Sequence, residues 1–146
     1  MDLGAFQEIL RKKAVDVGCV LEMDLFPEDG ITTKPGKKSK LKRFVIVGKT
    51  KDGSLLASLI VNSEINNGLF CIIGPYQHLL RAKENSCVDH DSYVDGYTLF
   101  EFNADRVISS GKFLGRISAE DLEECRKHVC DSPKTKPYQK KKFNLE

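Results

Sequence analysis

The stretch KPGKKSKLKRFVIVG, from Lys34 to Gly48, joins a basic loop directly to an apolar segment. Its cations follow one another without an intervening acid: Lys34, Lys37, Lys38, Lys40, Lys42 and Arg43. The run from Phe44 to Gly48 is typical of a buried strand. A basic loop that ends in an arginine at a strand entrance can bind phosphates and hold one guanidinium rigidly, which suggests a nucleic-acid site. A solvated hairpin connection around Pro35-Gly36 has the same composition, so the charges alone leave both interpretations open.

The composition indicates one globular domain whose charges are unevenly placed. A chain of 146 residues with 40% hydrophobic and 30% charged residues can bury a core and fold without a partner. The net charge of +2 is too small to attract polyanions by itself. Cations crowd into the segment 34–43, whereas the segment 84–105 holds acids and no Lys or Arg. We therefore expect one basic surface and a separate acidic one.

Neither a membrane segment nor a metal site is expected. The first residues lack the features of a signal peptide, and no apolar run approaches the roughly 20 residues that span a bilayer, so we expect a cytoplasmic protein without membrane contact. The 5 cysteines are scattered and odd in number, which favours reduced thiols. Cys125, His128 and Cys130 lie close together in sequence but do not supply a four-ligand zinc set.

The periodicity of apolar residues predicts a mainly β (α+β) domain over residues 1–131. An amphipathic helix at 3–14, a barrel over about 17–117 and a helix at 119–130 that begins at Ser118 are expected. The expected strands are 17–23, 43–48, 55–61, 70–73, 78–80 and 97–102, with a tight turn at Asp52-Gly53. The helix at 3–14 has the pattern of an added cap or a dimerisation element. Residues 132–146 contain two prolines and five lysines, so a basic flexible tail is predicted.

Several motifs occur in an order that resembles the MazF/PemK family of growth-inhibiting toxins. Gly18-Cys19-Val20 opens a strand, Asp24-Leu25-Phe26-Pro27-Glu28-Asp29-Gly30 has the spacing of the family's Asp-x-x-Pro-x-x-Gly loop, and Arg43 begins the next apolar strand. Ser63 stands where the family has Thr or Ser after its third strand. Gly115-Arg116-Ile117 leads into the last helix in a similar way.

This resemblance implies a small SH3-like antiparallel barrel with flanking helices, usually a homodimer. It implies cleavage of single-stranded RNA without metal or cofactor, leaving a 2′,3′-cyclic phosphate, and neutralisation by an acidic antitoxin. By position, Arg43 and Ser63 are the implied catalytic residues. The residues expected to contact RNA are Lys37, Lys38, Lys40 and Lys42 at phosphates and Phe44 at a base.

The chain also departs from the family pattern. Phe44 replaces the family's proline, and Thr98 and Phe100 stand where Gln and a following Arg or Lys are usual. These departures support an alternative, a catalytically degenerate barrel that binds nucleic acid or protein. The three histidines, His78, His90 and His128, offer a second route to acid–base chemistry, and each has the alternative of an ordinary surface residue.

Overall fold

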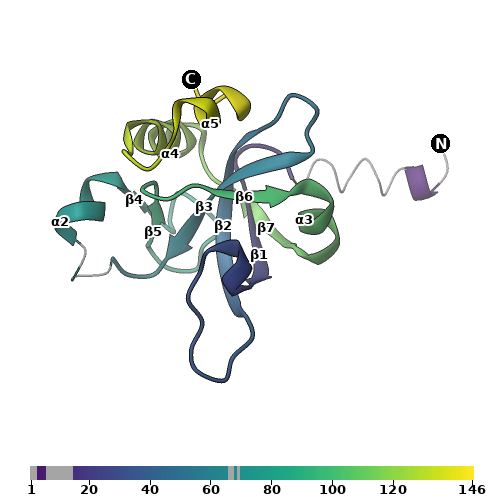
Figure 1. Ribbon diagram of the computed structural model, residues 1–146, viewed down its shortest axis with the longest axis horizontal. Coiled ribbons are helices and arrows are strands. Elements are labelled where there is room, and N and C mark those ends of the chain that lie inside the picture. The colour runs from purple at the N-terminus through teal and green to yellow at the C-terminus, as the bar shows by residue number, and fades with distance from the viewer. Residues whose placement is uncertain (1–2, 6–14, 66–67, 69) are drawn as a thin grey trace.

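The computed structural model, which describes residues 3–5, 15–65, 68 and 70–146, is built around an antiparallel sheet (Figure 1). One sheet has the strand order β4-β5-β3-β2-β1-β7, and β6 pairs with β3 outside this path. The strands are β1 (Cys19–Leu25), β2 (Lys40–Lys49), β3 (Leu55–Asn62), β4 (Gln77–Leu80), β5 (Ser92–Asp95), β6 (Phe100–Asn103) and β7 (Lys112–Arg116). β3 pairs with β6 along its first half and with β5 at its end, so the sheet curls.

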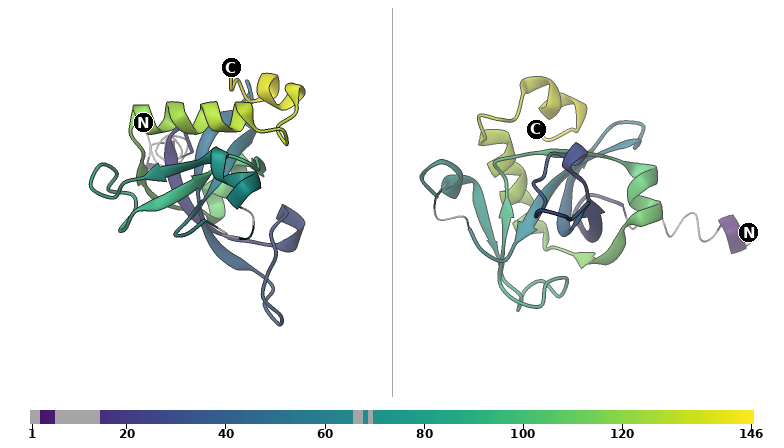
Figure 2. Two further views of the ribbon diagram at one scale, coloured as in Figure 1. Left: turned by 90° about the vertical axis from the view of Figure 1, so that its left-hand side faces the viewer. Right: turned by 60° about the horizontal axis from the view of Figure 1, so that its bottom comes forward.

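Short helices connect and cover this sheet. They are η1 (Pro27–Asp29), α2 (Phe70–Ile73), η3 (Gly74–Tyr76), α3 (Ala104–Ser110), α4 (Ala119–Asp131) and α5 (Pro137–Lys142). Figure 2 shows α4 lying across one side of the barrel, whereas the loop between β1 and β2 projects on the opposite side. The predicted mainly β (α+β) class is confirmed, and the curled sheet is consistent with a small barrel-like fold.

The middle of β2, from Phe44 to Val47, is a continuous apolar run because both of its faces are covered. On one face of β2, Val45 and Val47 belong to a core that includes Val129 of α4. On the other face, Phe44 and Ile46 belong to a core completed by β6 and α3. A strand buried on both sides shows a continuous apolar run rather than alternation, which is the pattern that the sequence shows there.

The predicted flexible tail is wrong, because the C-terminal residues pack into the core. Phe143 is 0% exposed and Leu145 is 4% exposed, and both contribute to the core cluster under α4. They lie against Gly48, where a Cβ atom would come within 2.5 Å of the Phe143 carbonyl oxygen. Of the five lysines that suggested a mobile arm, three lie at exposed or half-buried positions of α5 and two, Lys134 and Lys136, are exposed residues before this helix. Phe143 and Leu145 are two apolar residues that alternate with polar ones at the end of the chain, and this pattern could have predicted that the segment packs against the core.

Other elements agree with the prediction only in part. Residues 70–73 form the helix α2 rather than a strand, and β5 and β7 were not predicted. The helix α4 begins as expected, since the Ser118 hydroxyl accepts a hydrogen bond from the Asp121 amide at 3.1 Å. Of the helix predicted at 3–14, residues 3–5 are helical and residues 6–14 lie outside the described residues. In the part of the chain that the structure describes, no helix has the length and apolar character needed to cross a membrane.

Candidate nucleic-acid groove

The loop between β1 and β2 is anchored at its base by an ion pair and carries exposed lysines. Asp29, in η1, accepts hydrogen bonds from Arg106 of α3 at 2.6 and 2.8 Å. This bidentate pair fixes the first part of the loop against the barrel. Lys37 and Lys38, farther along the loop, are exposed to solvent. The loop therefore presents their charges away from the barrel surface.

Two of the predicted loop lysines are strand residues. Because β2 begins at Lys40, alternation along the strand places Lys40 and Lys42 on one face and Arg43 on the other. The Lys42 ammonium donates to the Asn62 side-chain oxygen at 3.0 Å, at the end of the neighbouring strand β3. Burial, followed by the nearby charge of Lys40, lowers the pKa of Lys42. These two cations are therefore held in position by the sheet.

Arg43 is held between two carboxylates. Its Nε donates to Glu22, the directly opposite residue on β1, at 3.2 Å, and its Nη1 donates to Asp89 at 3.2 Å. The Glu22 carboxylate, with a further contribution from Asp89, raises the pKa of Arg43. The side chain is still 32% exposed. Arg43 is thus a fixed cation with an open side.

The structure brings Arg43 and Ser63 to one groove, which we call the arginine groove. It has a volume of about 430 Å³ and is lined by both of these residues and by Lys40 and Lys42. Ser63 directly follows β3 and is exposed. The register pairs Arg43 with Val61, so the ends of β2 and β3 place the guanidinium and the hydroxyl on the same part of the surface. The structure therefore brings these two residues together, and their catalytic role stays a prediction.

A second groove continues from the first across the shared residues Lys40, Lys42 and Asn62. It has a volume of about 330 Å³, and we call it the lysine groove. Thr98 and Phe100, the two positions that depart from the family pattern, line it. It is also lined by Ile31, Asp95 and Lys134. Lys134, from the C-terminal segment, therefore brings a cation to the region where the expected basic residue is missing.

Phe44 does not contribute to either groove. Its side chain is 0% exposed, and its ring lies 5.0 Å from that of Phe102, centroid to centroid, in an edge-on arrangement. The predicted stacking of Phe44 on a base is therefore wrong, because a buried ring has no face to offer. The physical reason is strand alternation, which turns Phe44 inward on the face opposite to that of Arg43.

The expected separation of basic and acidic surfaces is also wrong. Glu22, Glu64 and Asp89 line the arginine groove together with its cations, and Asp95 lines the lysine groove. Asp89 comes from the acidic segment 84–105, which folds back beside β2. Glu22 was not identified from the sequence as a residue of the groove, because an acidic side chain on a short strand is usually exposed to solvent. The β1–β2 register, which the sequence does not specify, places Glu22 opposite Arg43.

Of the three histidines, only His90 lines the arginine groove among the described residues. His78 instead contacts Asp121 of α4 at 2.7 Å, in a half-buried network with Asn85 and Ser118. His128 lies on α4, and its ring centroid is 6.1 Å from that of His78. The network ties the start of α4 to β4, which is a structural role. Within the described ranges, no group of three or more His, Cys, Asp or Glu side chains is placed to hold a metal ion.

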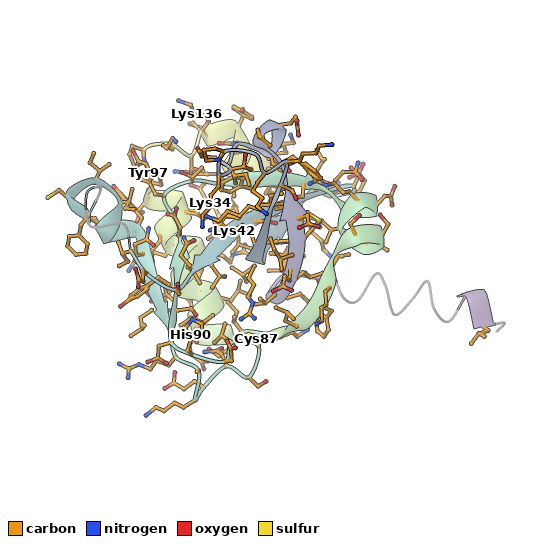
Figure 3. All side chains as sticks on the ribbon, turned by 90° about the horizontal axis from the view of Figure 1, so that it is seen from below. Lys34, Lys42, Cys87, His90, Tyr97 and Lys136 are labelled. Atoms are coloured by element: carbon orange, nitrogen blue, oxygen red, sulfur yellow. The ribbon has the colours of Figure 1, made fainter. Side chains whose placement is uncertain are left out.

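Figure 3 views the molecule from the side of the β1–β2 loop and shows how the labelled residues are distributed. Lys34 and Lys42 lie near the middle of this face, with Tyr97 toward one end and His90 toward the other. The Lys134 ammonium lies 5.5 Å from the centroid of the Tyr97 ring. The Tyr97 ring therefore lies beside Lys134, one of the cations that line the lysine groove.

Comparison with known proteins supports the fold alone. No protein-family model and no curated protein matches the chain by sequence. Among solved structures, a chain in the crystal structure of MazE-MazF (Form-III) from Deinococcus radiodurans is similar, with a TM-score of 0.53 and 15% sequence identity. The match covers 78% of this chain and 91% of the other. At this level of identity, the similarity shows that the chain has a MazF-like fold.

Proposed function

We propose that this protein is a metal-independent endoribonuclease that cleaves single-stranded RNA, a MazF/PemK-like toxin of a type II toxin–antitoxin system. The observation that carries the proposal is the shared groove of Arg43 and Ser63, flanked by Lys40 and Lys42. The MazF-like fold supports it.

The groove has the chemistry that attack by a ribose 2′-hydroxyl requires. Negative charge grows on the phosphate oxygens during this reaction, and a fixed guanidinium stabilises it through charge-assisted hydrogen bonds. Arg43 has further N–H donors besides those bound to Glu22 and Asp89. The hydroxyl of Ser63 can donate to another phosphate oxygen, and Lys40 and Lys42 can bind the neighbouring phosphates.

The test is cleavage of a long single-stranded RNA in the presence of a metal chelator. We expect the unaltered protein to produce fragments that end in cyclic phosphate. Arg43→Ala should slow cleavage by about 10²–10³-fold, the range for loss of one stabilising donor. Lys51→Ala, at the exposed turn between β2 and β3, is the control and should cleave normally. Equal rates for Arg43→Ala and the unaltered protein would contradict the proposal, as would no cleavage by either.

A second candidate is a barrel that binds RNA or protein without catalysis. The pairing of Arg43 with two carboxylates favours it, since part of the positive charge is already neutralised. Filter binding separates the two candidates. Salt-sensitive RNA binding without fragments identifies a nucleic-acid-binding module, and absence of RNA binding indicates a protein partner.

We further propose a homodimer and an acidic antitoxin that covers the two grooves. The resemblance implies both, and the similar solved structure contains MazE together with MazF. A short, acidic, partly disordered protein is suited to wrap a basic groove. Light scattering of the purified chain should give a dimer mass. The product of a neighbouring reading frame, if it is the antitoxin, should bind the dimer and inhibit cleavage, whereas a product that binds and leaves cleavage unchanged is not the antitoxin.

A further inference from the structure

We propose that Glu22 is the general base and His90 the general acid of the RNA cleavage reaction. This inference rests on the proposed function and assigns its proton transfers. Neither residue is part of the motifs that carry the family resemblance. Both line the arginine groove with Arg43 and Ser63.

A continuous chain of polar contacts joins the two groups through the phosphate-binding arginine. Glu22 Oε2 lies 3.2 Å from Arg43 Nε, and Arg43 Nη1 lies 3.2 Å from Asp89 Oδ1. The same Asp89 oxygen lies 3.1 Å from Nδ1 of His90. The guanidinium therefore contacts Glu22 directly through Nε and is linked to the His90 imidazole through Asp89. A phosphate bound to Arg43 would lie between a proton acceptor and a proton donor.

The chemistry of the side chains assigns the roles. An ordinary glutamate is ionised near neutral pH and can accept a proton, whereas histidine exists in both forms there and can donate one. Glu22 is only 21% exposed, and its contact with Arg43 fixes its position. His90 is held through Nδ1, which leaves Nε2 as the ring nitrogen to face a leaving group. Asp89 contacts both Arg43 and His90 and is a positioning residue.

Arg43, Ser63 and Lys42, which also line the groove, are poorly suited to these proton transfers. The hydrogen bond to Glu22 is the main cause that raises the pKa of Arg43, so the guanidinium stays charged and cannot act as the base. A serine hydroxyl such as that of Ser63 is a weak acid and needs a partner before it can donate or accept a proton. Lys42 has its ammonium bound to Asn62. The Glu22 carboxylate and the His90 imidazole together supply the proton acceptor and the proton donor that a metal-free reaction needs.

In the proposed step, one bond forms to phosphorus and one breaks. The 2′-oxygen attacks phosphorus while the Glu22 carboxylate takes the 2′-hydroxyl proton. The bond from phosphorus to the 5′-oxygen breaks, and the His90 imidazolium gives its proton to that oxygen. The products are a 2′,3′-cyclic phosphate and a 5′-hydroxyl. Glu22 is then protonated and His90 neutral, and exchange with water restores both.

The test uses the pH dependence of cleavage by the full chain. For the unaltered protein we expect a bell-shaped profile, rising as the base ionises and falling as the acid loses its proton. Glu22→Gln should remove the acidic limb and His90→Gln the alkaline limb, each with a rate loss of about 10²–10⁴-fold. Glu28→Gln, on the exposed helix η1, and His128→Gln, on α4, are matched controls that should keep both limbs.

A substrate with an activated leaving group separates catalysis from structural damage. A uridine 3′-(4-nitrophenyl) phosphate releases 4-nitrophenolate, which needs no proton to leave. His90→Gln should cleave this substrate nearly as fast as the unaltered protein, and Glu22→Gln should remain slow. Cleavage of RNA with both limbs intact in these two variants would overturn the inference and leave the proposed function standing. No RNA cleavage by the unaltered protein would overturn both.

Discussion

Nη1 of Arg43 lies 3.2 Å from Oδ1 of Asp89, so a carboxylate from the segment before β5 contacts the strand that carries the basic run. The Asp89 side chain is 75% exposed, whereas that of Arg43 is 32% exposed. The pair therefore sits at the mouth of the arginine groove. Under the proposed function, an RNA phosphate in this groove would compete with Asp89 for donors on Arg43 and would approach its negative charge.

Removing this charge should strengthen RNA binding. We expect Asp89→Asn to bind a single-stranded oligonucleotide roughly two- to fivefold more tightly at low salt, as loss of an exposed unfavourable charge predicts. Asp105→Asn, an exposed charge at the start of α3, removes the same charge outside both grooves and should not change affinity. Filter binding at several salt concentrations measures the difference. Equal affinities of the two variants would show that Asp89 does not face bound RNA.

The strand lysines should contribute to the salt dependence of RNA binding. Lys42 lines both grooves and is held against Asn62, so we expect it to contact a phosphate. Lys42→Gln should make the slope of log K against log salt shallower by about 0.7, the contribution of one contact to single-stranded nucleic acid. Lys51→Gln, at the turn between β2 and β3, should leave the slope unchanged. A Lys42→Gln slope equal to that of the unaltered protein would remove Lys42 from the binding surface.

The buried C-terminal phenylalanine should be essential for stability. Phe143→Ala removes a fully buried ring and should lower the free energy of unfolding by about 3–5 kcal/mol. Tyr138→Ala, on the exposed side of α5, should change it by less than about 0.5 kcal/mol. Urea unfolding monitored by circular dichroism measures both. Similar unfolding midpoints for the two variants would mean that the C-terminal segment does not belong to the cooperative core.

The Asp121 network should make stability fall in acid. Burial alone would raise the pKa of Asp121, but hydrogen bonds from His78, Asn85 and Ser118 outweigh it and lower the pKa. A carboxyl whose pKa is lower in the folded state stabilises the fold above its unfolded-state pKa of about 4, and this contribution is lost as pH falls through the folded value.

Unfolding in urea between about pH 6 and about pH 3 tests this. The unaltered protein should lose stability more steeply toward acid than Asp121→Asn, which has no carboxyl to protonate. Asp131→Asn, exposed at the other end of α4, is the control and should keep the steep loss. Parallel curves for the unaltered protein and Asp121→Asn would show that the network does not cause the acid sensitivity.

The sequence predicted elements wherever a local pattern dominates. The apolar run after Arg43, the Asp52-Gly53 turn and the Ser118 cap each depend on neighbouring residues, and each leads to an element of the structure. Phe70–Ile73 shows the limit of such patterns, since a short apolar run fits a strand or a helical turn equally well.

The candidate site depends on contacts between distant segments, which no local pattern specifies. Sequence motifs selected Arg43 and Ser63, and the fold places both in one groove. Glu22 and Asp89 approach Arg43 only through the β1–β2 register and the return of the chain before β5. The inward orientation of Phe44 follows from the start of β2 at Lys40, which lies inside the stretch that looked like a loop.

The packing of the C-terminal segment against Gly48 also orders events during protein synthesis. Phe143 and Leu145 are translated after every strand of the sheet, so the core beside β2 stays open to water until they emerge. At about 5–20 residues per second, roughly 5 to 20 s separate the synthesis of β2 from that of Phe143. The barrel therefore completes its core only after the ribosome has translated the strands that carry the arginine groove.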